Sequence, residues 1–99
     1  MRGVWDPKKD RINRQKHGIG FETALGVFSD PFALSALDRI EDGEERWQTI
    51  GLIEGVAVVL VAHVFRDDGE GDETVRIISA RRATRRERRR YEEERAGHA

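Results

Sequence analysis

The residues best suited to chemistry in this chain are cations and a few groups that can exchange protons. Fifteen of the eighteen basic residues are Arg, whose planar guanidinium group suits phosphate and carboxylate partners. Metal-free RNA cleavage needs a base for the 2′-hydroxyl, an acid for the leaving oxygen and fixed cations for the phosphate. The sequence permits this chemistry without demonstrating it, since His, Glu or Lys can serve as the base.

The candidate base residues lie at the ends of two predicted helices. Lys16 and His17 close the first helix, and Glu22 opens the second. Each also has a structural explanation, because His17 and Glu22 match the partial charge of their helix ends. Arg76, which points outward from a predicted strand, is the residue least easily explained by structure alone. Tyr91 could take part in chemistry or simply pack the last helix.

A metal centre is not expected. The chain has no cysteine, and its histidines, His17, His63 and His98, show no ligand spacing. No Gly-rich phosphate loop is present either, so the sequence predicts no cofactor. His63 lies within an apolar run, which favours a core histidine.

Charge is strongly segregated along the chain. Formal charges are +4 over residues 1–20, −10 over residues 21–75 and +5 over residues 76–99, in agreement with the net charge of −1. If the fold brings the two basic ends together, they form one surface for a polyanion such as RNA. The alternative is two solvated helices without a partner. The basic residues that we expect to bind RNA are Lys9, Arg82, Arg85, Arg86 and Arg89.

Length and patterning predict one α+β domain with two helices at the N-terminus. Asp6-Pro7 begins a helix that runs to Lys16 or His17, with Gly18 as its C-cap. Apolar spacing predicts a short core-facing helix from Phe21 to Phe28, ended by Ser29-Asp30-Pro31. Val4-Trp5 is either a short strand or a packing anchor.

The middle of the chain predicts a small antiparallel meander of about four strands. The strands are expected at 33–37, 46–53, 56–65 and 74–80, separated by a polar loop at 38–44, a turn at 54–55 and an acidic loop at 67–72. In the last strand, alternation places Val75, Ile77 and Ser79 opposite Arg76, Ile78 and Ala80.

An Arg-rich helix is predicted at the C-terminus. Thr84 and Glu87 form a capping box for a helix from Arg85 to about Arg95. Its few apolar residues predict that it is mobile or completed by a partner. The longest apolar run, 56–65, is too short to cross a bilayer, and a cytoplasmic protein without a membrane partner is expected.

Three stretches resemble the BrnT family of toxins from bacterial type II toxin–antitoxin systems. They are WDPKKDRINRQKHGIGFETALGVFSDP at 5–31, GEERWQTIGL at 43–52 and VRIISARRATRRERRRYEEE at 75–94. The resemblance implies a RelE-like fold and metal-independent RNA cleavage that arrests translation. By position, it implies functional roles for Lys16, His17, Glu22, Arg76, Ser79, Arg81 and Tyr91.

The resemblance also implies a partner. This would be a cognate antitoxin with a ribbon-helix-helix domain, in a 2:2 complex that binds operator DNA only through the antitoxin. Two other hypotheses remain open from sequence. One is a non-catalytic module that binds nucleic acid or the ribosome, and the other is an interaction subunit whose last helix is completed by a partner protein.

Overall fold

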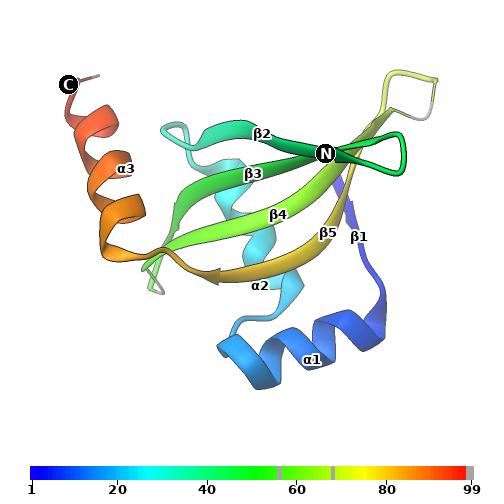
Figure 1. The fold of residues 1–99 in the computed structure, drawn as a ribbon, viewed down its shortest axis with the longest axis horizontal. Helices are drawn as coiled ribbons and strands as arrows, with labels where there is room; N and C mark the ends of the chain where they lie inside the picture. Colours follow the sequence, from blue (N-terminus) through cyan, green and yellow to red (C-terminus); the bar gives the residue numbers. More distant parts are fainter. Residues whose placement is uncertain (56, 68, 98–99) are drawn as a thin grey trace.

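A five-stranded sheet carries two helices on one face and a third helix at one end (Figure 1). The structure is a computed structural model that describes residues 1–55, 57–67 and 69–97. In chain order the elements are β1 (Arg2–Val4), α1 (Pro7–His17), α2 (Phe21–Ala24), the 3-10 helix η1 (Leu25–Ser29), β2 (Leu34–Glu41), β3 (Glu44–Ile53), β4 (Ala57–Asp67), β5 (Glu73–Arg82) and α3 (Arg85–Gly97).

The first helix begins and ends as the sequence predicts. The Asp6 side chain accepts a hydrogen bond from the Lys8 N–H (2.9 Å), and Pro7 occupies the first helical turn. Gly18 closes the helix in the left-handed conformation, with φ of 73°. Asp10 joins α1 to the next helix, because its carboxylate accepts the Phe21 N–H at 2.9 Å.

The predicted second helix is present in two parts, α2 and η1. Its predicted end at Ser29 is confirmed, but the second half winds as a tighter 3-10 helix that lies against β3. A Cβ atom at Gly51 would lie 3.0 Å from the Val27 carbonyl oxygen. Only glycine therefore lets this segment approach the sheet so closely.

The sheet differs from the predicted four-stranded antiparallel meander, because it is mixed and has five strands. The order is β1-β5-β4-β3-β2, and β1 pairs parallel with β5. The sequence left a short strand at Val4-Trp5 as one of two alternatives and the four-strand count did not include it, because three residues carry too little pattern to distinguish a strand from a packing anchor. Trp5, which follows β1, packs edge-on against Phe21, so this segment also anchors the core.

The loop predicted at residues 38–44 was wrong, since most of it is a hairpin. Strand β2 runs to Glu41, β3 starts at Glu44, and Asp42-Gly43 makes a two-residue turn with φ of 52° and 76°. Asp-Gly is a strong signal for such a turn. The charged residues of this segment are compatible with strands because they lie at an exposed sheet edge, where Glu41 pairs with Arg39 of its own strand and with Arg46 of β3.

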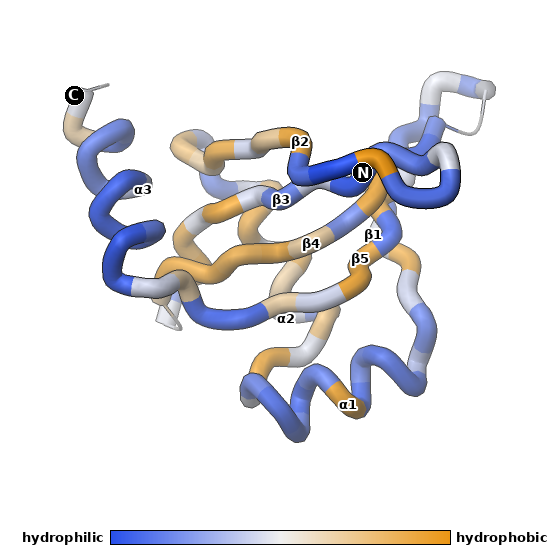
Figure 2. The backbone as a smooth tube through the Cα atoms, viewed as in Figure 1, coloured by the Kyte–Doolittle hydropathy of each residue, from blue (hydrophilic) through white to orange (hydrophobic). Residues whose placement is uncertain are grey.

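The core lies between the sheet and the α1–α2–η1 layer. Figure 2 shows apolar residues concentrated in the sheet, whereas α1 and α3 are largely hydrophilic. The buried cluster consists of Ile19, Phe21, Ala24, Val27, Ile53, Val59, Val61, Ile77 and Ala80. The predicted turn at Glu54-Gly55 is present, and Val56, the predicted first residue of the next strand, lies outside the described residues.

The C-terminal helix starts with the predicted capping box. The Thr84 N–H bonds the Glu87 carboxylate at 2.9 Å, and the Glu87 N–H bonds the Thr84 hydroxyl at 3.2 Å. Only Tyr91 is buried in this helix. Across the described ranges, no helix combines the length and apolar character needed to span a membrane.

Candidate functional site

Three of the predicted site residues share the face of β5 that the α1–α2 layer leaves open. Across the strand pair, Arg76 is opposite Val64, Ser79 is opposite Ala62, and Arg81 is opposite Leu60. Residues 60, 62 and 64 of β4 alternate with the core residues Val59 and Val61, so they lie on the open face. Their partners on β5 lie on the same face. The structure therefore brings Arg76, Ser79 and Arg81 together along one strand.

This arrangement depends on a β-bulge that simple alternation did not predict. The register shifts between Ala62 and His63, which leaves one extra residue on β5 between Ile77 and Ser79. Ser79 consequently joins Arg76 on the open face, and Ala80 turns into the core with Ile77. The predicted assignment of these residues to the two faces of the strand was thus correct up to Ile77 and wrong beyond it.

Asn13 of α1 stabilises the strand just beyond the bulge. Its side-chain amide donates to the carbonyl oxygens of Ala80 (2.8 Å) and Ile19 (2.9 Å), and its oxygen accepts the Ala80 N–H at 3.1 Å. Asn13 is buried, so all three bonds lie away from water. Helix α1 therefore contributes a buried structural residue as well as exposed cations such as Lys9 and Lys16.

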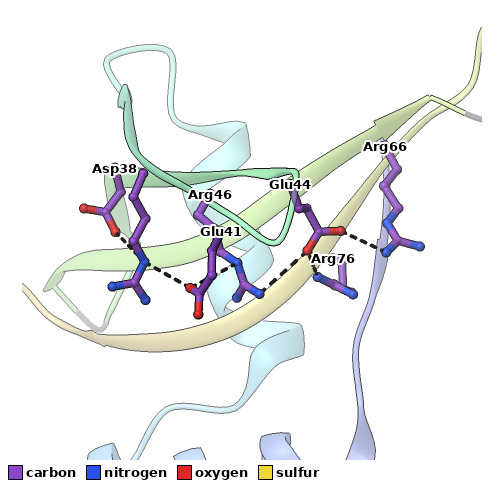
Figure 3. A network of polar contacts seen from close by, with 7 residues as sticks. Asp38, Glu41, Glu44, Arg46, Arg66 and Arg76 are labelled. Atoms are coloured by element: carbon purple, nitrogen blue, oxygen red, sulfur yellow. Dashed lines mark hydrogen bonds and ion pairs between the residues drawn. The ribbon is translucent and has the colours of Figure 1, made fainter.

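Arg76 is held by a carboxylate that sequence analysis did not single out. Glu44 of β3 bonds the Arg76 guanidinium, and it also contacts Arg66 at 3.3 Å and Arg46 at 3.7 Å (Figure 3). Burial opposes ionisation of Glu44, but the charges of Arg76 and Arg66 outweigh it and lower the pKa of this carboxyl. The signal available in the sequence was the stretch GEERW, which the family resemblance contained without pointing to a role.

Arg81 has a carboxylate of its own. Two of its nitrogens bond the two oxygens of Glu87, at 2.8 Å and 3.1 Å. The hydrogen bonds from Arg81, aided by the capping bonds with Thr84, lower the pKa of the Glu87 carboxyl to about 2. This bidentate pair fixes the start of α3 to the end of β5.

A groove of about 250 Å³ lies beside this pair, between α3 and the open face of the sheet. Its apolar wall is formed by side chains of β2, β3 and β4, and its polar wall comes from α3. The lining residues are Leu34, Ala36, Ile50, Leu60, Glu87 and Arg90, with Gln48 among the polar contributors.

Lys16, His17 and Glu22 do not join the open-face residues. Lys16 and His17 end α1, and Glu22 is an exposed residue of α2. Both helices belong to the layer that covers the other face of the sheet. Within the described residues, no hydrogen bond or ion pair connects these three to Arg76, Ser79 or Arg81.

Tyr91 is engaged in packing and in a hydrogen bond to Asp30. Its side chain is buried, and its hydroxyl donates to the Asp30 carboxylate. Burial together with this bond raises the pKa of Tyr91 to about 12. The tyrosine thereby attaches α3 to the segment that follows η1, which is one of the two roles considered from sequence.

The residues predicted to bind RNA are exposed on three elements. Lys9 lies on α1, whereas the others lie at the end of β5 and on α3: Arg82, Arg85, Arg86 and Arg89. Arg85, Arg88 and Arg89 border a shallow surface hollow together with Glu92. The helices of the two basic ends do not lie side by side, since α1 lies against one face of the sheet and α3 lies at one end of it (Figure 1).

His63 has the structural role favoured from sequence. It is fully buried, its Nε2 lies 2.7 Å from the Thr49 hydroxyl, and its ring packs edge-on against Phe28. Burial lowers the pKa of His63 to about 4. In the part of the chain that the structure describes, no three His, Asp or Glu side chains gather closely enough to hold a metal ion; His98 lies outside that part.

Comparison with known proteins agrees with the sequence resemblance. No curated protein matches the chain. The crystal structure of the Brucella abortus ribonuclease toxin BrnT matches with a TM-score of 0.59 and 20% identity, covering 86% of this chain and 100% of that one. This likeness shows a shared fold. A family model described as the ribonuclease toxin BrnT of type II toxin–antitoxin systems matches residues 5–87. The chain therefore belongs to the BrnT family of ribonuclease toxins.

Proposed function

We propose that this chain is an endoribonuclease toxin that cleaves RNA without a metal ion and thereby arrests translation in the cytoplasm. In the proposed step, a 2′-hydroxyl loses its proton to a base, and its oxygen bonds the adjacent phosphorus. The bond from phosphorus to the 5′-oxygen breaks, and that oxygen takes up a proton. The products are a 2′,3′-cyclic phosphate and a free 5′-hydroxyl.

The observation that carries this proposal is the row of Arg76, Ser79 and Arg81 on the open face of β5. Guanidinium groups placed beside a hydroxyl can bind a phosphodiester and stabilise the additional negative charge of its pentavalent state. Arg76 is one-third exposed, so a phosphate oxygen can reach its guanidinium group.

The base and the acid are proposed among the groups that the family resemblance indicates. Lys16, His17 and Glu22 remain the candidates for the base, although their helices lie on the other face of the sheet. Tyr91 is a candidate acid or base only through its position in the family resemblance, because its hydroxyl is bonded to Asp30. Single alanine variants at these four positions, compared by cleavage rate, distinguish them.

The first experiment is digestion of total RNA by the purified chain in EDTA. We expect fragments that end in 2′,3′-cyclic phosphate or 3′-phosphate. Arg76→Ala should lower the rate by about 10²- to 10³-fold, the loss typical when a group that stabilises transition-state charge is removed. Circular dichroism checks that the variant is folded. Wild-type rates from a folded Arg76→Ala protein would contradict the role of Arg76.

A second candidate function is binding of RNA or the ribosome without cleavage. The exposed arginines of α3 favour it, since they can contact RNA phosphates whether or not the RNA is cleaved. The digestion separates the two functions. Intact RNA from folded protein that still binds RNA in a salt-dependent manner supports the binding module.

We further propose a cognate ribbon-helix-helix antitoxin as the partner, with operator DNA bound only through it. Since such antitoxins dimerise and each subunit would carry one toxin, the expected complex is 2:2. Native mass spectrometry of the co-expressed pair tests this assembly, and a mass that corresponds to a 1:1 or 1:2 complex would contradict it.

A further inference from the structure

One carboxylate on the open face of the sheet is shared among three arginines from three strands. Glu44 of β3 contacts Arg46 of the same strand, Arg66 of β4 and Arg76 of β5. Figure 3 shows the three side chains pointing toward this carboxylate. Within the described residues, the ion pairs of Arg66 and Arg76 go to Glu44 alone.

The cluster has more positive charge than its acids can neutralise. Arg46 is also 3.8 Å from Glu41, which in turn pairs with Arg39 at 3.1 Å. Asp38 completes a chain of four arginines and three carboxylates, which carries a net charge of +1. The surplus lies where Arg46, Arg66 and Arg76 all contact the one carboxylate of Glu44. Arg81, further along β5, instead forms a bidentate pair with Glu87.

The hydrogen-bonding capacity of the cluster is also only partly used. Arg46 reaches the two carboxylates at 3.7 and 3.8 Å, which is beyond hydrogen-bond length. Its Nε atom is buried without an acceptor in the part of the chain that the structure describes. The side chains of Arg66 and Arg76 are 52% and 33% exposed, so an anion from solvent can reach both.

We propose that Arg46, Arg66 and Arg76 form a binding site for one phosphodiester of the RNA backbone, and that Glu44 occupies this site until the phosphate displaces it. A phosphodiester and a carboxylate each carry one negative charge on two oxygens, so either can be bound by the same guanidinium groups. The phosphate site rests on the proposed function, which it deepens by naming two further substrate-binding residues, Arg46 and Arg66, and a competing acid, Glu44.

The proposal requires opposite effects from neighbouring substitutions. Glu44→Gln keeps the shape of the side chain but removes the competing charge, so RNA should bind about 3- to 10-fold more tightly. Arg66→Gln should weaken binding by a similar factor and lower the slope of log K against log salt by about 0.7, the value for one contact with single-stranded nucleic acid. Arg46→Gln should act in the same direction as Arg66→Gln.

Binding is measured by fluorescence anisotropy with a short labelled 2′-O-methyl RNA, over a series of salt concentrations. This probe has no free 2′-hydroxyl, so binding is observed without cleavage. Glu45→Gln and Arg11→Gln are matched controls, since each makes the same charge change at an exposed position outside the cluster: Glu45 alternates to the opposite face of β3, and Arg11 lies on α1. Both should bind within about 2-fold of wild type, since neither removes a contact with the phosphate.

Two results would overturn the phosphate site. Wild-type affinity in Arg66→Gln would exclude the arginines as ligands, and this half-exposed residue can be replaced without disturbing the core even if Arg46→Gln fails to fold. Unchanged or weaker binding by Glu44→Gln would exclude the displacement. The digestion in EDTA reports separately on the nuclease. If RNA is cut while these variants bind like wild type, only the site fails; if the variants behave as expected and RNA stays intact, only the cleavage fails.

Discussion

Removal of the Tyr91 hydroxyl tests whether this residue has a chemical or a structural role. Because this hydroxyl is buried and bonded to Asp30, we expect Tyr91→Phe to lower the free energy of unfolding by about 1 kcal/mol. The cleavage rate per folded molecule should stay near that of wild type. Urea denaturation and the RNA cleavage assay measure the two quantities. A folded Tyr91→Phe protein whose rate has fallen by more than about tenfold would assign chemistry to the hydroxyl.

His63 makes stability depend on pH in the mildly acidic range. Its pKa is about 4 in the folded protein, below the ordinary value of 6.5. Between these values the unfolded chain binds a proton that the folded protein does not, so stability falls as the pH is lowered from 6.5 to 4. We expect His63→Gln to reduce this fall in the free energy of unfolding by roughly 2 kcal/mol. Equal slopes for both proteins in urea denaturation between about pH 7 and pH 4 would contradict this assignment.

Among the secondary-structure elements, α1 contributes to the site through the backbone of β5. Asn13→Ala removes three buried hydrogen bonds and leaves the Ala80 and Ile19 backbone groups without those partners. We expect a loss of about 2–3 kcal/mol in the free energy of unfolding. Gln15→Ala, an exposed change on the same helix, should stay within about 0.5 kcal/mol of wild type. Similar melting curves for the two variants would show that the Asn13 hydrogen bonds contribute little.

The start of α3 depends on Glu87, which caps the helix and pairs with Arg81. We expect Glu87→Gln to destabilise the protein by about 1–2 kcal/mol at pH 7. Since the folded pKa of about 2 lies below the ordinary value of 4.5, the contribution is complete above pH 4.5 and is lost as the pH falls toward 2. The gap between variant and wild type should therefore close in acid. Glu92→Gln serves as the control, since Glu92 forms an exposed ion pair with Arg88 on the helix surface.

For the molecule as a whole, the segregated charge predicts where RNA lies. If α3 contacts the backbone, replacing Arg85 and Arg89 together by Gln should reduce the salt slope of RNA binding by about 1.4, which is about 0.7 for each phosphate that is no longer bound. Replacing Arg2 and Arg11 makes the same change in net charge on other exposed elements, and it should leave the slope unchanged. Equal slopes for the two double variants would place RNA elsewhere.

Much of the fold could be predicted from sequence because it is specified locally. The caps of α1 and α3 involve residues at most a few positions apart, and the apolar run of β4 is typical of a central strand. The five-stranded mixed sheet could not be predicted in the same way, because β1 is only three residues long and pairs with residues 74–76 at the far end of the chain.

The amino-acid sequence by itself determined the family, the segregation of charge and the identity of Arg76, Ser79 and Arg81 as site candidates. Only the tertiary structure decided how they are arranged. The bulge that brings Ser79 onto the face of Arg76 lies beside hydrogen bonds from Asn13, 67 residues away from Ala80. Glu44 meets Arg76 across three strands. Contacts between distant residues follow from packing and strand register, which local patterns along the chain do not encode.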